Sequence, residues 1–144
     1  MSQQERDAVL AEAREWLRTP YHHKAAIKGA GVDCAMILIE VYAAVGLISH
    51  IDVGDYPQDW MMHRSEERYL GWVEKYAHTV ESPKPGDIAV FKFGRCFSHA
   101  AIVVDYPHII HAYRPAGMVV LDDMSINADL AERKIKFYSL WGND

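Results

Sequence analysis

A cysteine at the start of an apolar segment has the clearest chemical potential in this sequence. Cys34 opens the almost wholly apolar run 34–45, with Asp33 before it and Gly46 after it. Asp and Gly are typical cap residues, so the pattern predicts a buried helix with Cys34 in its first turn. The N–H groups of a helix N-terminus lower a thiol pKa and can bind an oxyanion, which suits acyl transfer. The alternative is that Cys34 is a small buried hydrophobe.

Two histidines are placed where they could serve such a thiol. His99 follows the turn 94–98 and opens an apolar run, and His111 ends the next run. The short turn 105–108 is expected to fold these runs as an antiparallel pair and to bring His111 back beside His99. His99 would then be the general base, and His111 would hold its other ring nitrogen and fix its tautomer. A satisfied edge-strand histidine is the alternative for His99.

A zinc site is a second interpretation of the same three residues. Cys34, His99 and His111 could be metal ligands, since Cys and His are the usual zinc donors. The sequence has no CxxC, HxxxH or HExxH pair that would support this arrangement. We therefore expect neither a metal nor a cofactor.

The elements that must position these residues change in character along the chain. Amphipathic spacing, caps and apolar runs predict helices at 4–17, 34–45 and 65–76. Residues 21–32 are interpreted as a loop, because Gly29 and Gly31 interrupt them. Later, short β-type runs separated by turns predict strands at 88–93, 100–104, 108–112, 118–121 and 135–140. Helices followed by strands indicate an α+β domain with an antiparallel sheet.

Length, charge and composition limit the class of protein. The 144 residues predict a single domain spanning 1–144, and a net charge of −5 with scattered Lys and Arg argues against a nucleic-acid partner. The two cysteines, Cys34 and Cys96, make no disulfide scaffold, and we expect free thiols after synthesis in the cytoplasm. Residues 1–14 lack the apolar core of a signal peptide, and no run has the roughly 20 apolar residues of a membrane span.

Five sequence blocks follow one another in a distinctive order. They are Thr19-Pro20-Tyr21, Gly31-Val32-Asp33-Cys34, Pro85-Gly86-Asp87-Ile88-Ala89-Val90-Phe91, Ser98-His99-Ala100-Ala101-Ile102-Val103 and Ile109-Ile110-His111-Ala112. In order and approximate spacing they resemble the blocks of the NlpC-type cell-wall cysteine peptidases. Any single block is weakly specific, but together they extend from Trp16 to about Leu121. The resemblance implies a papain-like fold, with the nucleophile at the start of a buried helix that packs on an antiparallel sheet.

The resemblance also implies a role for each site residue. Cys34 would be the nucleophile, His99 the general base and later the acid, and His111 the orienting group. Tyr21 would assist the oxyanion site or the amine end of the substrate, and Asp33 would face the substrate amine as well as cap the helix. The implied reaction is hydrolysis of an amide in a peptidoglycan stem peptide, often between D-glutamate and a diamino acid, without a cofactor.

A subgroup of this family resembles the chain in a further stretch. Tyr56-Pro57-Gln58-Asp59-Trp60, and then residues 63–70, are similar to short phage and prophage tail members that lack a signal peptide. A tail particle would deliver such an enzyme to the cell wall, so phage tail proteins are the expected partners.

The chain departs from the family directly after the cysteine. Ala35-Met36 stands where the family commonly has Ser or Leu followed by Gly. Ala35 lacks a hydroxyl that can contact substrate, and Met36 either packs into the core or narrows the pocket. Two alternatives to a peptidase therefore remain. One is a degenerate tail-tip component with a structural or wall-binding role, and the other is an amidase or acyltransferase on the same fold.

Overall fold

The computed structural model describes residues 2–49, 68–94 and 96–142. The elements in chain order are α1 (Ser2–Glu15), β1 (Ala26–Ile27), β2 (Gly31–Val32), α2 (Cys34–Val45), α4 (Arg68–Tyr76), β3 (His78–Val80), β4 (Ile88–Phe93), β5 (Cys96–Asp105), β6 (His108–Tyr113), the 3-10 helix η1 (Arg114–Ala116), β7 (Met118–Asp123) and β8 (Ile135–Ser139). Among them, β3 to β8 form a six-stranded antiparallel sheet in the order β3-β8-β4-β5-β6-β7. The α+β class predicted from the sequence is confirmed.

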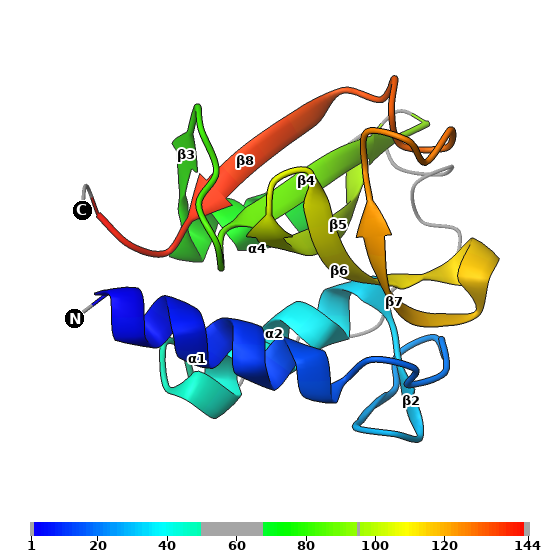
Figure 1. The fold of residues 1–144 in the computed structure, drawn as a ribbon, viewed down its shortest axis with the longest axis horizontal. Helices are drawn as coiled ribbons and strands as arrows, with labels where there is room; N and C mark the ends of the chain where they lie inside the picture. Colours follow the sequence, from blue (N-terminus) through cyan, green and yellow to red (C-terminus); the bar gives the residue numbers. More distant parts are fainter. Residues whose placement is uncertain (1, 50–67, 95, 143–144) are drawn as a thin grey trace.

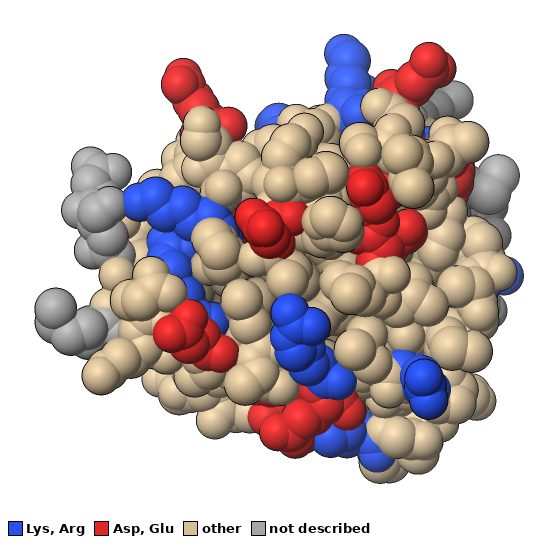
Figure 2. Space-filling view, viewed as in Figure 1, with Lys and Arg blue, Asp and Glu red and all other residues tan. Residues whose placement is uncertain are grey.

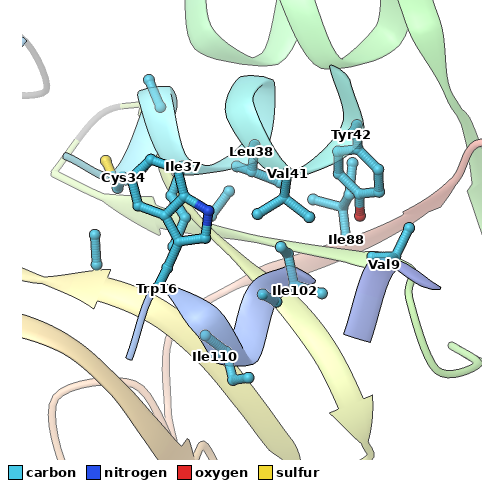
Figure 3. Close-up of a cluster of buried hydrophobic side chains, with 14 of the residues drawn as sticks. Val9, Trp16, Cys34, Ile37, Leu38, Val41, Tyr42, Ile88, Ile102 and Ile110 are labelled. Atoms are coloured by element: carbon cyan, nitrogen blue, oxygen red, sulfur yellow. The ribbon is translucent and has the colours of Figure 1, made fainter. Parts of the chain in front are cut away.

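The helices α1 and α2 lie together against one face of the sheet (Figure 1). The contact is a cluster of buried apolar side chains, in which the alternate residues Ala100 and Ile102 of β5 meet Val9 of α1, Trp16 in the turn after α1, and Ile37 of α2. Figure 3 shows Cys34 at one end of this cluster. Every second residue of β5 therefore faces the helices that cover this side of the sheet.

The other face of the sheet has its own apolar cluster. Phe91, Ala101 and Val103 point to this side and are covered by Met124 and Leu130, which come from the connection between β7 and β8. Because successive strand residues alternate between the two faces, both faces of β4 and β5 are buried. This explains why these strands read as continuous apolar runs rather than as alternating ones.

A buried ion pair fastens α1 to the start of β4. Arg6 donates from one nitrogen to Asp87 and to the carbonyl of Pro85, both at 2.9 Å. Its guanidinium carbon lies 4.2 Å from the ring centroid of Trp141. Arg6 and Asp87 are almost fully buried, so each neutralises a charge that would otherwise be costly inside the protein.

The predicted elements compare with the observed ones as follows. Helix 34–45 is confirmed at both ends, and predicted helix 4–17 is α1, which begins and ends two residues earlier. The prediction of a turn at 94–98 is wrong, because β5 already begins at Cys96 and His99 lies inside the strand. Residues 21–32, predicted as a loop, contain the short strands β1 and β2. The predicted helix start at 65–67 and the phage-like block 56–60 lie outside the described residues.

Surface charge is mixed on the face shown in Figure 2, where Lys and Arg side chains alternate with Asp and Glu. Within the described residues, no helix combines the length and the apolar character needed to cross a membrane.

Candidate active site

Cys34 occupies the first position of α2, where its neighbours fix the helix start. Asp33 has extended backbone angles, and its Oδ1 accepts from the backbone N–H groups of Ala35 and Met36 at 3.2 and 2.9 Å. Its Oδ2 accepts from the backbone N–H of Lys24 at 2.8 Å. This side chain therefore uses its acceptors to cap the helix and to hold the preceding loop, and it is only 2% exposed.

The strands β5 and β6 separate where Cys34 approaches the sheet. Their pairing runs from Ile102–Ile110 toward the turn and does not include Ser98 or Ala100. A bulge falls at the same place, since Phe91 pairs with His99 and Lys92 with Phe97, leaving Ser98 as the extra residue. On its β6 side, β5 is thus left without a paired strand in this stretch, although it stays paired with β4.

The thiol of Cys34 occupies that position. Its sulfur lies 3.8 Å from the carbonyl oxygen of Ser98, to which the thiol donates. The backbone N–H of Ala100 also hydrogen-bonds to the sulfur. The sulfur therefore contacts the β5 backbone on both sides of His99.

Tyr21 approaches the same sulfur from the loop before α2. Its side chain hydrogen-bonds to Cys34, and burial raises the pKa of Tyr21, so the phenol stays protonated and acts as the donor. A bridge to Val32 and a 2.8 Å hydrogen bond from the Tyr21 N–H to the carbonyl of Gly117 fix its backbone. Arg114, at the start of η1, is close enough to Tyr21 to oppose the rise in its pKa.

His99 and His111 form the pair that the sequence predicted. Nε2 of His99 lies 2.8 Å from Nδ1 of His111, and both rings are buried. Phe93 and Tyr113 surround His99, with ring centroids 5.5 and 6.0 Å from its own. The contact uses Nε2 of His99, so Nδ1 is the ring nitrogen that is not directed at His111.

Asp122 is a member of the site that sequence reasoning missed. Its Oδ2 lies 3.0 Å from Nε2 of His111, and this hydrogen bond, which opposes the effect of burial, lowers the pKa of Asp122. Asn127 also donates to Oδ2, at 2.7 Å, and Tyr113 stacks on His111 with centroids 4.6 Å apart. The only signal in the sequence was an acidic residue at the end of a strand next to His111.

The protonation of the thiol differs from the sequence-based expectation. A helix N-terminus lowers a thiol pKa, but burial is the larger effect here and, together with the neighbouring Asp33 carboxylate, it raises the pKa of Cys34. Burial also lowers the pKa of His99 well below its ordinary value, and the nearby His111 and Arg133 add to this. Both groups are therefore neutral at rest.

The zinc interpretation does not suit this geometry. His111 uses Nδ1 toward His99 and Nε2 toward Asp122, so it has no ring nitrogen left for a metal. Among the residues that the structure describes, no group of three or more Cys, His, Asp or Glu side chains could hold a metal ion.

The residues after the cysteine are placed as follows. Ala35 is buried, and Met36 is partly buried and packs against the cluster between the helices and the sheet. The first of the two interpretations of Met36, a contribution to the core, agrees with this contact.

These elements form the papain-like α+β fold that the sequence blocks imply, and comparison with solved structures specifies it further as the NlpC/p60 fold. The NlpC/p60 domain of the peptidoglycan hydrolase SagA superposes with a TM-score of 0.59 at 21% identity, over 91% of this chain and 96% of that one. The peptidoglycan hydrolase RipB from Mycobacterium tuberculosis gives 0.64 at 17% identity, over 98% and 67%.

An N-acetylmuramoyl-L-alanine amidase from Bacteroides uniformis gives a TM-score of 0.59 at 13% identity, over 94% of this chain and 98% of that one. No family model matches the sequence, and no curated protein matches it. At these identities the likeness establishes the fold, and function must be argued from the site.

Proposed function

We propose that this protein is a cysteine peptidase of the NlpC type that hydrolyses an amide bond in peptidoglycan stem peptides. One observation carries the proposal: the Cys34 sulfur contacts the β5 backbone on both sides of His99, whose ring is held by His111. Nucleophilic acyl transfer requires a thiol within reach of an oriented imidazole, and these backbone contacts bring the sulfur to the residue that carries such a ring.

The reaction begins from a neutral thiol and a neutral imidazole. The thiol proton moves to Nδ1 of His99 as the sulfur attacks the scissile carbonyl carbon. The resulting oxyanion is stabilised by the N-terminus of α2 and by the phenol of Tyr21. The intermediate then collapses to a thioester, and His99 gives its proton to the leaving amine. A water molecule then gives a proton to His99 and attacks the thioester carbonyl carbon. The C–S bond breaks, the carboxylic acid is released, and His99 returns the proton to the sulfur.

The substrate class rests on proteins that share the fold. SagA and RipB are described as peptidoglycan hydrolases, and SagA is matched over nearly its whole compared chain. The specific bond that we propose is the one between D-glutamate and the diamino acid. The resemblance of residues 56–70 to tail proteins supports delivery to the wall on a phage or prophage tail, with tail proteins as partners.

Mass analysis of digested peptidoglycan tests the proposal. The wild-type protein should release fragments with a new amino group on the diamino acid and a new carboxylate on D-glutamate. Cys34→Ala should abolish their release, while Cys96→Ala, the matched thiol control, should retain it. Undiminished release by Cys34→Ala would refute the assignment of the nucleophile.

A second candidate reaction is cleavage between the glycan and the peptide. The similarity to an N-acetylmuramoyl-L-alanine amidase over nearly the whole of both chains favours it. In that reaction Cys34 would attack the lactyl carbonyl of muramic acid, so the thioester would carry the glycan side and L-alanine would be the leaving amine. The masses distinguish the two, because an amidase releases complete stem peptides with a free L-alanine amine.

A further inference from the structure

The pair of histidines raises the question of which nitrogen carries each proton. A neutral imidazole has one N–H and one lone pair, so the 2.8 Å contact between His99 and His111 permits two proton arrangements. In one, His99 donates from Nε2 and presents a lone pair at Nδ1. In the other, His111 donates from Nδ1, and His99 then carries its proton on Nδ1. Only the first arrangement gives the thiol a base.

Asp122 decides between the two arrangements. Its carboxylate is an acceptor only, so Nε2 of His111, 3.0 Å away, must donate to it. A neutral His111 then has its lone pair on Nδ1 and accepts from Nε2 of His99. Consequently the lone pair of His99 lies on Nδ1.

We propose that Asp122 is a positioning residue that fixes the tautomers of both histidines, so that His99 presents an unprotonated Nδ1. The inference rests on the proposed function for the use made of that nitrogen, but the tautomers themselves can be measured without substrate. Asp122 acts through His111, to which it hydrogen-bonds, and it was not among the expected site residues.

The surroundings of Asp122 show which substitution reverses the tautomers. Its Oδ1 accepts from the backbone N–H of Asp123 at 2.8 Å, and its Oδ2 accepts from the side chain of Asn127 at 2.7 Å. An Asn at position 122 therefore meets a donor on each side, whichever way its amide is turned. Asn127 cannot easily turn to relieve this, because its own Oδ1 accepts from the backbone N–H of Asp129 at 2.9 Å.

Removing the side-chain donor of Asn127 leaves only one donor, the backbone N–H of Asp123, and this fixes which way the new amide at position 122 is turned. In the double variant Asp122→Asn/Asn127→Ala, the amide oxygen stays with the backbone N–H of Asp123, and the amide nitrogen faces His111. The new amide then donates to Nε2 of His111, which reverses both rings and places the proton of His99 on Nδ1. Asn127→Ala alone keeps the carboxylate and is the matched control.

Nitrogen NMR of the histidine rings tests the proposal directly. At pH 8, above the range in which imidazoles ordinarily titrate, the wild-type protein and Asn127→Ala should show an unprotonated Nδ1 on both rings. The double variant should show a protonated Nδ1 on both. A wild-type His99 protonated on Nδ1, or a double variant with the tautomers of its control, would overturn the proposal.

Kinetics adds the functional arm. Relative to Asn127→Ala, the double variant should lose on the order of 10² to 10⁴-fold in kcat, the range seen when an orienting carboxylate is replaced. Reversed tautomers with unchanged kcat would refute the positioning role. If the wild-type protein cleaves no peptidoglycan at all, the proposed function fails, while the NMR result still decides whether Asp122 sets the tautomers.

Discussion

The protonation state of Cys34 leads to a prediction that separates two mechanisms. An ordinary thiol, with a pKa of about 8.5, is about 3% thiolate at pH 7, and each additional pKa unit reduces that fraction tenfold. Burial and the Asp33 carboxylate raise the pKa of Cys34 well above the ordinary value, against the weaker effect of the Tyr21 hydrogen bond. Because only the thiolate reacts with iodoacetamide, we expect alkylation at pH 7 to be more than about tenfold slower than for a free cysteine.

The assay measures the alkylation rate of Cys34 between pH 5 and pH 10 by mass spectrometry. A Cys96→Ala background leaves one thiol to follow, and Cys34→Ala in the same background gives the blank. The rate should rise about tenfold per pH unit across the neutral range without levelling off. A rate that is already constant between pH 5 and pH 6 would reveal a preformed thiolate and imidazolium, and would refute the general-base mechanism proposed above.

Three further predictions concern stability. Arg6→Ala leaves Asp87 buried without its cation, so it should lower the free energy of unfolding, measured in urea, by about 3–5 kcal/mol. The control Arg14→Ala, on the exposed face of α1, should change it by less than about 0.5 kcal/mol. Equal losses in the two variants would contradict this account. Ser98→Ala removes a buried hydroxyl that has no hydrogen-bond partner among the residues that the structure describes, so it should stabilise the protein by about 1 kcal/mol in the same measurement. A clear loss of stability would show that the hydroxyl is satisfied. The pKa of His99 is lower in the folded state than its unfolded value of about 6.5, so its contribution to stability is present above that pH and is lost as the pH falls, by up to about 1.4 kcal/mol per pH unit. His99→Gln should therefore flatten the fall in the free energy of unfolding below this pH. An unchanged slope would exclude His99 as its source.

The helix that carries the nucleophile was predictable because its determinants are local. A nearly continuous apolar run, an Asp before it and a Gly after it are enough to set both ends of α2, and Gly46 does adopt the left-handed conformation of a C-cap. The closeness of His99 and His111 was also predictable, since a short turn between two strands fixes which residues face each other.

The error at residues 94–98 arose from the same local reasoning. A bulge places Ser98 as an extra residue within β5, and its polar side chain interrupts the apolar pattern without ending the strand. The role of Asp122 and the raised pKa of Cys34 could not be predicted from the sequence, for a different reason. Both depend on which strands lie side by side and on how deeply the thiol is buried, and only the three-dimensional packing determines these.

The pair of imidazoles gives the strongest argument against a purely structural role for Cys34. A structural thiol would be sufficiently explained by the backbone groups at Ser98 and Ala100, whose hydrogen bonds it completes. Such a thiol would need no hydrogen-bonded pair of imidazoles starting from the strand that it contacts. Yet His111 is fully buried, and both of its nitrogens are used, in a chain that ends at a carboxylate. Burying polar rings costs free energy unless every group is paired, and an apolar pair would pack the same space without that cost. What the hydrogen-bonded chain provides, and an apolar pair would not, is a lone pair of fixed position on His99.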